Sequence, residues 1–186
     1  MDIKKVKQYY KKHRSTDGKL SDKVIIHILT SDDDIVHGAQ SINKQLPKYL
    51  QRHTEDWDIY TDDKPEVIAK KIERELDKKY GGNYFIVEPA KHEGTYKVKS
   101  KVTGDTMADV TFIEDEVTYK KIGKVNYTTL DFEVKKIKDS LASEQHKFRH
   151  IKDLNALQRI RIGIASKKKS TTKKQKIYSS RAGGIR

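Results

Sequence analysis

The sequence predicts an α/β (α+β) fold, in which a small mixed β-sheet with flanking helices is followed by a C-terminal helical pair and a basic tail. Three observations support this prediction. Short apolar runs of strand length alternate with segments of helical periodicity through most of the 186-residue chain. From Leu130 onward the apolar residues step at helical spacing alone. Residues 167–186 carry eight basic residues and no acidic one.

The first elements follow from local patterns. A basic amphipathic helix is predicted over residues 2–14, where apolar residues recur at helical spacing between lysines. Residues 23–29 fit a strand or a buried helical turn equally well, because so short an apolar run has no decisive period. Residues 35–36 form a short strand that ends at Gly38, and the helix that follows ends or kinks at Pro47.

The remaining elements alternate strands with helices. A strand over residues 53–61 precedes a helix that has Pro65 in its first turn and closes at Gly81. The segment 116–129 fits no single element. Further strands are predicted over residues 83–90, 94–102 and 107–114, the last two as a hairpin, and two helices have apolar faces that begin at Leu130 and Ile151.

These elements predict three regions: a core over residues 1–118, a C-terminal helical region over residues 119–166 and a disordered basic tail over residues 167–186. Net charge is +13, and much of the excess lies in the tail. Such a tail is typical either of a contact with RNA, DNA or another polyanion or of a solvated end that keeps the protein soluble. Both interpretations stay open.

Composition excludes several classes of site. The chain has no cysteine, which excludes disulfides, zinc sites with thiolate ligands and cysteine nucleophiles. Hydrophobic residues make up 34% and charged residues 36%, so a core forms under a heavily charged surface. We find neither an apolar signal segment nor a bilayer-spanning stretch, and therefore expect a cytoplasmic protein without a membrane partner.

Two carboxylates flank a tryptophan in the segment "DWDIY". On a strand, Asp56 and Asp58 project from one face while Trp57 faces the core. Such close like charges repel unless a cation or proton lies between them. If the strand that carries Asp109 lies beside this one, three carboxylates converge and suit one or two Mg²⁺ ions, with Mn²⁺ as an alternative. The other interpretation of an Asp-x-Asp pattern is a solvated strand edge.

The turn at Gly38 has a pattern that suits a phosphate group. A glycine between a strand and a helix lets the backbone approach a ligand closely, and the amides at the start of the helix point toward it. Ser41 lies one helical step further on. The alternative is that the glycine only makes the turn.

The segments "VHGAQSINKQL" and "RHTEDWDIY" resemble the nucleotidyltransferase superfamily that includes DNA polymerase beta. The resemblance spans about residues 24–162 and is closest to AbiEii-toxin-like and small viral nucleotidyltransferases, including poly(A)-polymerase-like ones. One departure is Ala39, where the family has Gly or Ser. The residues in register with the family's pattern are Arg52, Thr54, Asp56, Asp58 and Asp109, with Arg149, Lys152 and Asp153 matching a C-terminal motif.

The resemblance implies transfer of a nucleoside monophosphate from an NTP such as ATP to a hydroxyl group, with release of pyrophosphate. Asp56 and Asp58 would hold two metal ions, and Asp109 would share the catalytic ion and help to deprotonate the acceptor. A nucleic-acid 3′ end is the favoured acceptor, with a protein or a small molecule as alternatives. The implied nucleotide-binding residues are Gly38, Ala39, Ser41, Arg52 and Lys138, and the predicted nucleic-acid contacts are Lys167, Lys168, Lys169, Lys173, Lys174 and Lys176.

The rival hypothesis is a catalytically inactive protein with the same fold, which serves as a nucleic-acid-binding or structural subunit of a larger assembly. A side chain that fills the phosphate turn would favour it. The AbiEii-like resemblance implies a toxin–antitoxin system and an antitoxin-like partner. The viral one implies a place in the host cytoplasm or the virion.

Overall fold

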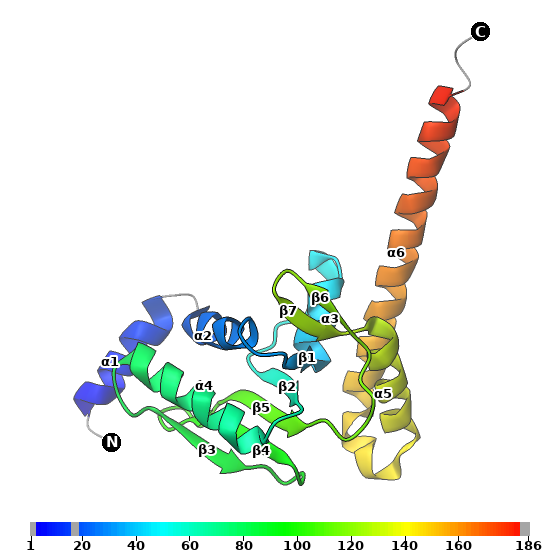
Figure 1. Ribbon diagram of the computed structural model, residues 1–186. Coiled ribbons are helices and arrows are strands. Elements are labelled where there is room, and N and C mark those ends of the chain that lie inside the picture. The colour runs from blue at the N-terminus through cyan, green and yellow to red at the C-terminus, as the bar shows by residue number, and fades with distance from the viewer. Residues whose placement is uncertain (1–2, 16–18, 183–186) are drawn as a thin grey trace.

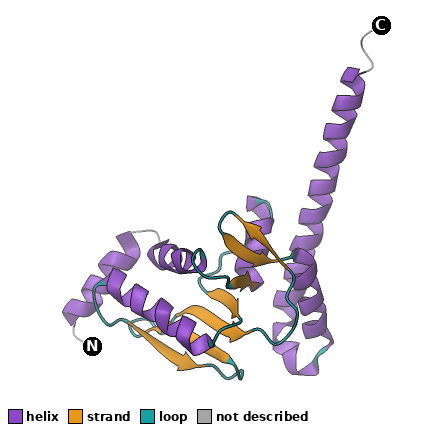
Figure 2. Cartoon of the chain, in the orientation of Figure 1, coloured by secondary structure: helices purple, strands orange, loops and turns teal. Residues whose placement is uncertain are grey.

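The computed structural model describes the backbone of residues 3–15 and 19–182 and the side chains of residues 3–11 and 20–166. Its centre is a seven-stranded mixed sheet with the strand order β3-β4-β5-β2-β1-β7-β6 (Figures 1 and 2). This architecture confirms the predicted α/β (α+β) class. The strands are β1 (Ile35–His37), β2 (Trp57–Thr61), β3 (Phe85–Pro89), β4 (Thr95–Ser100), β5 (Thr106–Phe112), β6 (Tyr119–Ile122) and β7 (Val125–Thr128).

The helices form two groups. In the larger group α4 packs on β3, β4 and β5, with α2 against it. In the second group α3 and α6 both contact α5, and α6 extends away from the sheet (Figure 1). The bounds are α1 (Ile3–Ser15), α2 (Lys19–Leu29), α3 (Gly38–Gln45), α4 (Pro65–Tyr80), α5 (Leu130–Ala142) and α6 (His150–Ala182), with short 3₁₀ helices η1 (Lys48–Leu50) and η2 (Glu144–Arg149).

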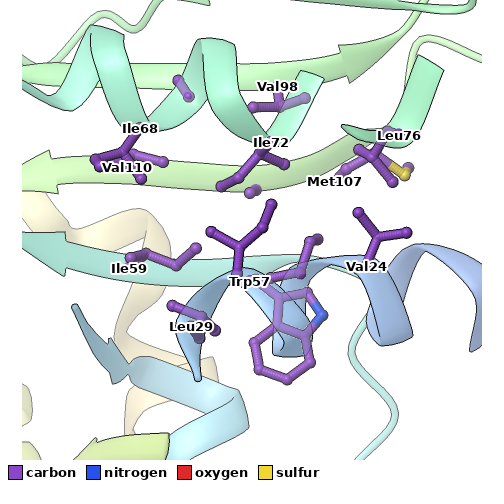
Figure 3. Packing of buried hydrophobic residues seen from close by; sticks show 14 of the residues in the cluster. Val24, Leu29, Trp57, Ile59, Ile68, Ile72, Leu76, Val98, Met107 and Val110 are labelled. Carbon is purple, nitrogen blue, oxygen red and sulfur yellow. The ribbon is translucent and has the colours of Figure 1, made fainter. Parts of the chain in front are cut away.

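The main core lies between the sheet and α1, α2 and α4. Trp57 and Ile59 of β2 meet Ile72 of α4 there, beside Val24 and Leu29 of α2 (Figure 3). The indole Nε1 of Trp57 donates to Asp22 Oδ1 at 2.8 Å, which ties β2 to α2. Burying the apolar face of β2 in this way fixes which of its side chains point to the opposite face.

Helix α4 shows how local sequence signals specify an element. Pro65 occupies its first turn, and Gly81 closes it with φ 75° and ψ 38°, a left-handed conformation that suits glycine. Ile68, Ile72 and Leu76 are buried at helical spacing. Val67, in the first turn of the same helix, is 47% exposed.

Several elements differ from the expectation. Residues 23–29 belong to helix α2, which settles the choice between strand and helix. Residues 119–122 and 125–128 form the β6–β7 hairpin, and β7 pairs with β1 in parallel, so the sheet extends past residue 118 into the expected helical region. The backbone of α6 continues to Ala182, and the disorder of the tail stays a prediction. The division into domains itself stays a prediction.

No helix in the described part of the chain combines the length and the apolar character that a membrane crossing requires.

The packing of α4 in the core predicts how far truncation of one of its buried side chains lowers the free energy of unfolding. Replacing Ile72, which is fully buried, with alanine should lower the free energy of unfolding by about 2–5 kcal/mol, because the cavity left behind cannot fully collapse. The matched control is Val67→Ala on the exposed side of the same helix, which should change it by less than about 0.5 kcal/mol. Urea denaturation measures both. Equal losses would contradict the observed orientation of α4.

Candidate functional site

The aspartates of the "DWDIY" segment lie where alternation along β2 places them. Trp57 and Ile59 are buried on one face of the strand, and Asp58 is half-buried on the other. Asp56 precedes the strand by one residue and has the same parity as Asp58. The predicted orientation of the tryptophan toward the core is therefore confirmed.

The sheet brings Asp109 to the side of Asp58. Strands β2 and β5 are parallel neighbours, and Asp58 and Asp109 are register partners. Neighbouring strands lie about 4.8 Å apart, and paired residues project from the same face. On the other side of β2, the antiparallel strand β1 places His37 opposite Asp58. Three acidic residues from two segments far apart in sequence thus meet on one face.

The electrostatic effect of this arrangement is a raised pKa of Asp58. Burial and then the negative charges of Asp56 and Asp109 raise its pKa to about 6, while Lys136 and Lys152 oppose the shift. The carboxylate form is disfavoured because it is removed from water beside like charges. A bound cation would reverse that preference.

Asp109 is held by a lysine that the sequence analysis did not select. Lys97 is its cross-strand partner on β4, and Lys97 Nζ donates to Asp109 Oδ2 at 2.6 Å. The other oxygen, Oδ1, is buried and has no hydrogen-bond partner. In the sequence, Lys97 is one of the lysines that alternate with apolar residues along a predicted strand. Only the register of β4 with β5 places it opposite Asp109.

The donor set suits an oxygen-preferring divalent cation. The buried Oδ1 of Asp109 lacks a donor, and Asp58 lies beside two other carboxylates, so both gain from a cation. In the conformation seen, the described residues form no group of three acidic or histidine side chains at metal-binding separation. Lys97 holds Oδ2 of Asp109 in this conformation, and the other oxygen, Oδ1, is the one without a donor.

Gly38 is required by its contact with Asp58. Its φ is +65°, and a Cβ atom built there would lie 2.4 Å from Asp58 Oδ2. A side chain at this position would therefore displace the carboxylate as well as strain the backbone. The next residue, Ala39, is buried and brings no hydroxyl group to the turn.

The amide of Gly38 already has a carboxylate partner. Gly38 N donates to Glu133 Oε1 at 2.7 Å, and Thr128 Oγ1 donates to the same oxygen at 2.6 Å. Glu133 is 2% exposed and lies on α5. Glu133 is not among the residues predicted from the sequence, because nothing local distinguishes it from the other acidic residues of that helix. A side chain thus occupies the amide that was expected to face a phosphate.

Ser41 requires a correction. It was predicted to contact a phosphate, but it is 0% exposed and its hydroxyl donates to the Thr128 carbonyl at 2.8 Å. Gln45 Nε2 donates to the same carbonyl at 2.9 Å. Ser41 thus helps to join α3 to β7 and cannot reach a ligand in this conformation. The reason is the pairing of β7 with β1, which covers this side of α3 and was not predicted.

Lys136 supplies a positive charge at the site. Its Nζ donates to the Tyr60 hydroxyl at 2.6 Å and lies 3.2 Å from His37 Nδ1, while the His37 and Tyr60 rings stack at 3.8 Å. Burial, then Lys136 and Arg149, lower the pKa of His37 well below its usual value, so the ring is neutral. Lys138, the predicted lysine of this helix, is exposed as Lys136 is, but it is not among the groups that act on Asp58 or His37. Helical spacing places Lys136 one turn after Glu133.

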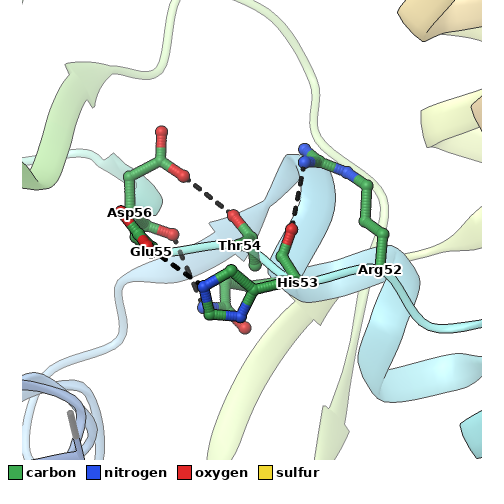
Figure 4. Close-up of polar contacts among 6 residues, drawn as sticks. Arg52, His53, Thr54, Glu55 and Asp56 are labelled. Carbon is green, nitrogen blue, oxygen red and sulfur yellow. Dashed lines mark hydrogen bonds and ion pairs between the residues drawn. The ribbon is translucent and has the colours of Figure 1, made fainter.

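Arg52 lies on the loop before β2, as Figure 4 shows. Its guanidinium donates to the His53 carbonyl at 3.3 Å. The side chain of Glu55 contacts His53 at 3.1 Å, and that of Asp56 accepts from Thr54 at 2.8 Å. A role for Arg52 in nucleotide binding stays a prediction.

The basic tail was predicted to contact nucleic acid. Its side chains lie outside the described ones, although α6 continues through them as backbone. Nearer the sheet, the charges of Lys152 in α6 and Arg149 in η2 act on Asp58 and His37, respectively. The predicted tail residues are Lys167, Lys168, Lys169, Lys173, Lys174 and Lys176.

Comparisons with known proteins find a solved structure with a similar fold but no match in sequence. No protein-family model matches the sequence, and no curated protein matches it. The crystal structure of the Megavirus polyadenylate synthase is similar, with a TM-score of 0.61 and 16% identity over 78% of this chain. The match covers 31% of the polyadenylate synthase, so this chain spans about a third of that protein. A second structure, JHP933 from Helicobacter pylori, has a TM-score of 0.39 and 13% identity over 68% of this chain and 56% of that one.

The likeness to the polyadenylate synthase concerns the arrangement of helices and strands. At 16% identity it extends to the fold alone. The AbiEii-like subfamily is not supported by it.

The charge of Asp58 predicts a pH-dependent stability. Its folded-state pKa of about 6 exceeds its ordinary value of 3.8, so the folded protein retains a proton that the unfolded chain loses. Stability of the metal-free protein should therefore fall as pH rises from about 4 to about 6. Asp58→Asn should remove this contribution and raise the free energy of unfolding by about 1–3 kcal/mol at pH 8.

Thermal unfolding in EDTA across this pH range tests the prediction, with Asp115→Asn on an exposed loop as the control. Part of the slope should remain in Asp58→Asn, because the pKa of Asp34 is also raised to about 6. A variant less stable than the wild type at pH 8 would contradict the described electrostatics.

Glu133 should act as a clamp between α5 and the Gly38 turn. Glu133→Ala leaves the Gly38 amide without its acceptor, at about 1–3 kcal/mol, while the Thr128 hydroxyl keeps the Ser41 hydroxyl within reach at 2.9 Å. Glu133→Gln keeps an acceptor oxygen of the same reach and should lose less than half as much. Denaturant unfolding compares the two, and equal losses would show that the acceptor geometry is unimportant.

Proposed function

We propose that the protein is a metal-dependent nucleotidyltransferase that moves a nucleoside monophosphate from an NTP to a hydroxyl acceptor and releases pyrophosphate. The observation that carries the proposal is the pairing of Asp58 with Asp109 on adjacent parallel strands, beside a glycine that leaves room for the carboxylate. The fold shared with the Megavirus polyadenylate synthase supports the same class of reaction.

Each acidic residue has a role in this proposal. Asp56 and Asp58 would hold the metal ions, and Asp109 would share one of them while accepting the proton of the attacking hydroxyl group. Bound Mg²⁺ would supply Lewis-acid stabilisation of the charge that develops on the phosphate oxygens. The donor set supports this role through the partnerless Oδ1 of Asp109 and the repulsion that raises the pKa of Asp58.

The phosphates of the nucleotide would meet lysines of the C-terminal helices. Lys136 contacts Tyr60 of β2, and the charges of Lys136 and Lys152 both lower the pKa of Asp58. A triphosphate would bring its negative charge between these lysines and the metal-binding face. We therefore assign Lys136 the role that the sequence analysis gave to Lys138 and Ser41.

ATP and an RNA 3′ end are the first substrates to test. The name of the Megavirus protein is that of an enzyme that makes polyadenylate, and this motivates both choices. We assign the basic tail no more than electrostatic attraction for the RNA backbone. A protein or small-molecule hydroxyl is the alternative acceptor.

One observation favours the inactive alternative. Glu133 already accepts the hydrogen bond of the Gly38 amide, and its negative charge would repel a phosphate at that turn. In an active enzyme the phosphates must therefore bind elsewhere on the site, beside Lys136. In an inactive one, the fold would serve only as a nucleic-acid-binding or structural subunit.

Nucleotidyl transfer is tested with each α-³²P-labelled NTP, Mg²⁺ or Mn²⁺, and RNA. The wild type should transfer label, and the Asp56→Asn, Asp58→Asn double variant should lose at least about a hundredfold in rate, since the metal-binding carboxylates are gone. Asp115→Asn is the control, because it removes an acidic residue from an exposed loop.

A second measurement does not depend on activity. Mn²⁺ should raise the melting temperature of the wild type and leave that of the double variant unchanged. The proposal fails if no NTP gives transfer and Mn²⁺ has equal effects on both proteins. RNA binding that survives the double substitution would then support the inactive alternative.

A further inference from the structure

A second acidic site lies at the far end of β2 from Asp56 and Asp58. A cavity of about 350 Å³ opens between the loop before β1 and the loop after β2, against the first turns of α4. None of its lining residues belongs to the candidate functional site. The acidic residues that line it are Asp32, Asp33, Asp34, Asp62 and Asp63.

Two of these carboxylates are explained by local contacts. Asp32 accepts from Lys71 Nζ through both of its oxygens, at 2.8 and 2.7 Å. Asp63 Oδ1 accepts from the Lys64 amide at 2.7 Å, just before the start of α4. Among the described residues that line the cavity, Lys71 is the single cation. Its one positive charge faces five carboxylates.

Asp34 is the residue that these contacts leave unexplained. It lines the cavity, is 5% exposed, and its Oδ2 is buried without a hydrogen-bond partner. Burial, together with the charges of Asp32 and Asp62, raises its pKa to about 6 despite a hydrogen bond with Thr61. A buried acceptor without a donor costs free energy, so a ligand that donates a hydrogen bond here would be stabilised.

The rest of the cavity indicates what kind of donor fits. Val67 and Ile68 form an apolar wall beside the carboxylates. An aliphatic ammonium group pairs its charge with carboxylates while its methylene groups cover an apolar surface. Lys71 already binds this acidic cluster in that way. A hydrated metal ion would make no use of the apolar wall.

We propose that this cavity binds an aliphatic ammonium group, which donates to Asp34 and lays its methylene groups along Val67 and Ile68. The source is a free polyamine or a lysine side chain of a partner polypeptide. The inference is independent of nucleotidyl transfer, because it involves none of the residues assigned to that reaction.

Isothermal titration calorimetry on the full chain at pH 8 tests the inference, with spermidine and a tri-lysine peptide as separate probes. We expect saturable binding of at least one probe, at one site per chain. Asp34→Asn should weaken it about tenfold or more, as expected for the loss of a charge-assisted hydrogen bond. The chain carries a net charge of +13, so general attraction of a polycation does not explain binding.

Two further variants control for folding and for charge. Asp62→Asn, at an exposed position of the same cavity, should weaken binding by a smaller factor, and Asp115→Asn, outside it, should have no effect. Binding of spermidine identifies a polyamine site, and binding of the peptide alone identifies a lysine of a partner. The proposal is overturned if neither probe binds, if Asp34→Asn binds as the wild type does, or if only MgCl₂ binds in an Asp34-dependent manner.

Discussion

Repulsion between carboxylates held on neighbouring strands is the constraint on which the site depends. The apolar face of β2 is buried through Trp57 and Ile59, so Asp58 must point to the other face. The parallel register with β5 then places Asp109 beside it. Burial and like charges raise the pKa of Asp58 to about 6. The folded chain therefore stores an unfavourable interaction that a cation relieves, as is common at functional sites.

Glu133 connects this acidic face to the C-terminal helices. It accepts hydrogen bonds from Gly38 and Thr128, and so joins α5 to the turn that touches Asp58. One turn further along α5, Lys136 contacts Tyr60 of β2. The same helix thus supplies a negative charge that holds the turn and a positive charge that faces the acidic residues. Movement of α5 would alter both at once, which couples the geometry of the turn to the charge of the site.

Strand β2 also connects the two acidic sites of the molecule. Asp58 projects from one face of the strand, whereas Thr61 lies on the other face, next to the cavity that contains Asp34. The two sites differ in chemistry. Carboxylates and nearby lysines make the first suitable for metal ions and phosphates, whereas the apolar wall of Val67 and Ile68 makes the second suitable for an aliphatic cation. Alternation along one strand is enough to keep them apart.

The sequence by itself determined the local features: the alternation that turns Trp57 inward, the bounds of α4 and the strands that carry the aspartates. Each depends on residues a few positions apart. Only the tertiary structure decided that residues 23–29 are helical, that β7 joins β1 and buries Ser41, and that Lys136 rather than Lys138 faces the site. These outcomes depend on strand register and helix orientation, which are set by contacts between residues far apart in the chain.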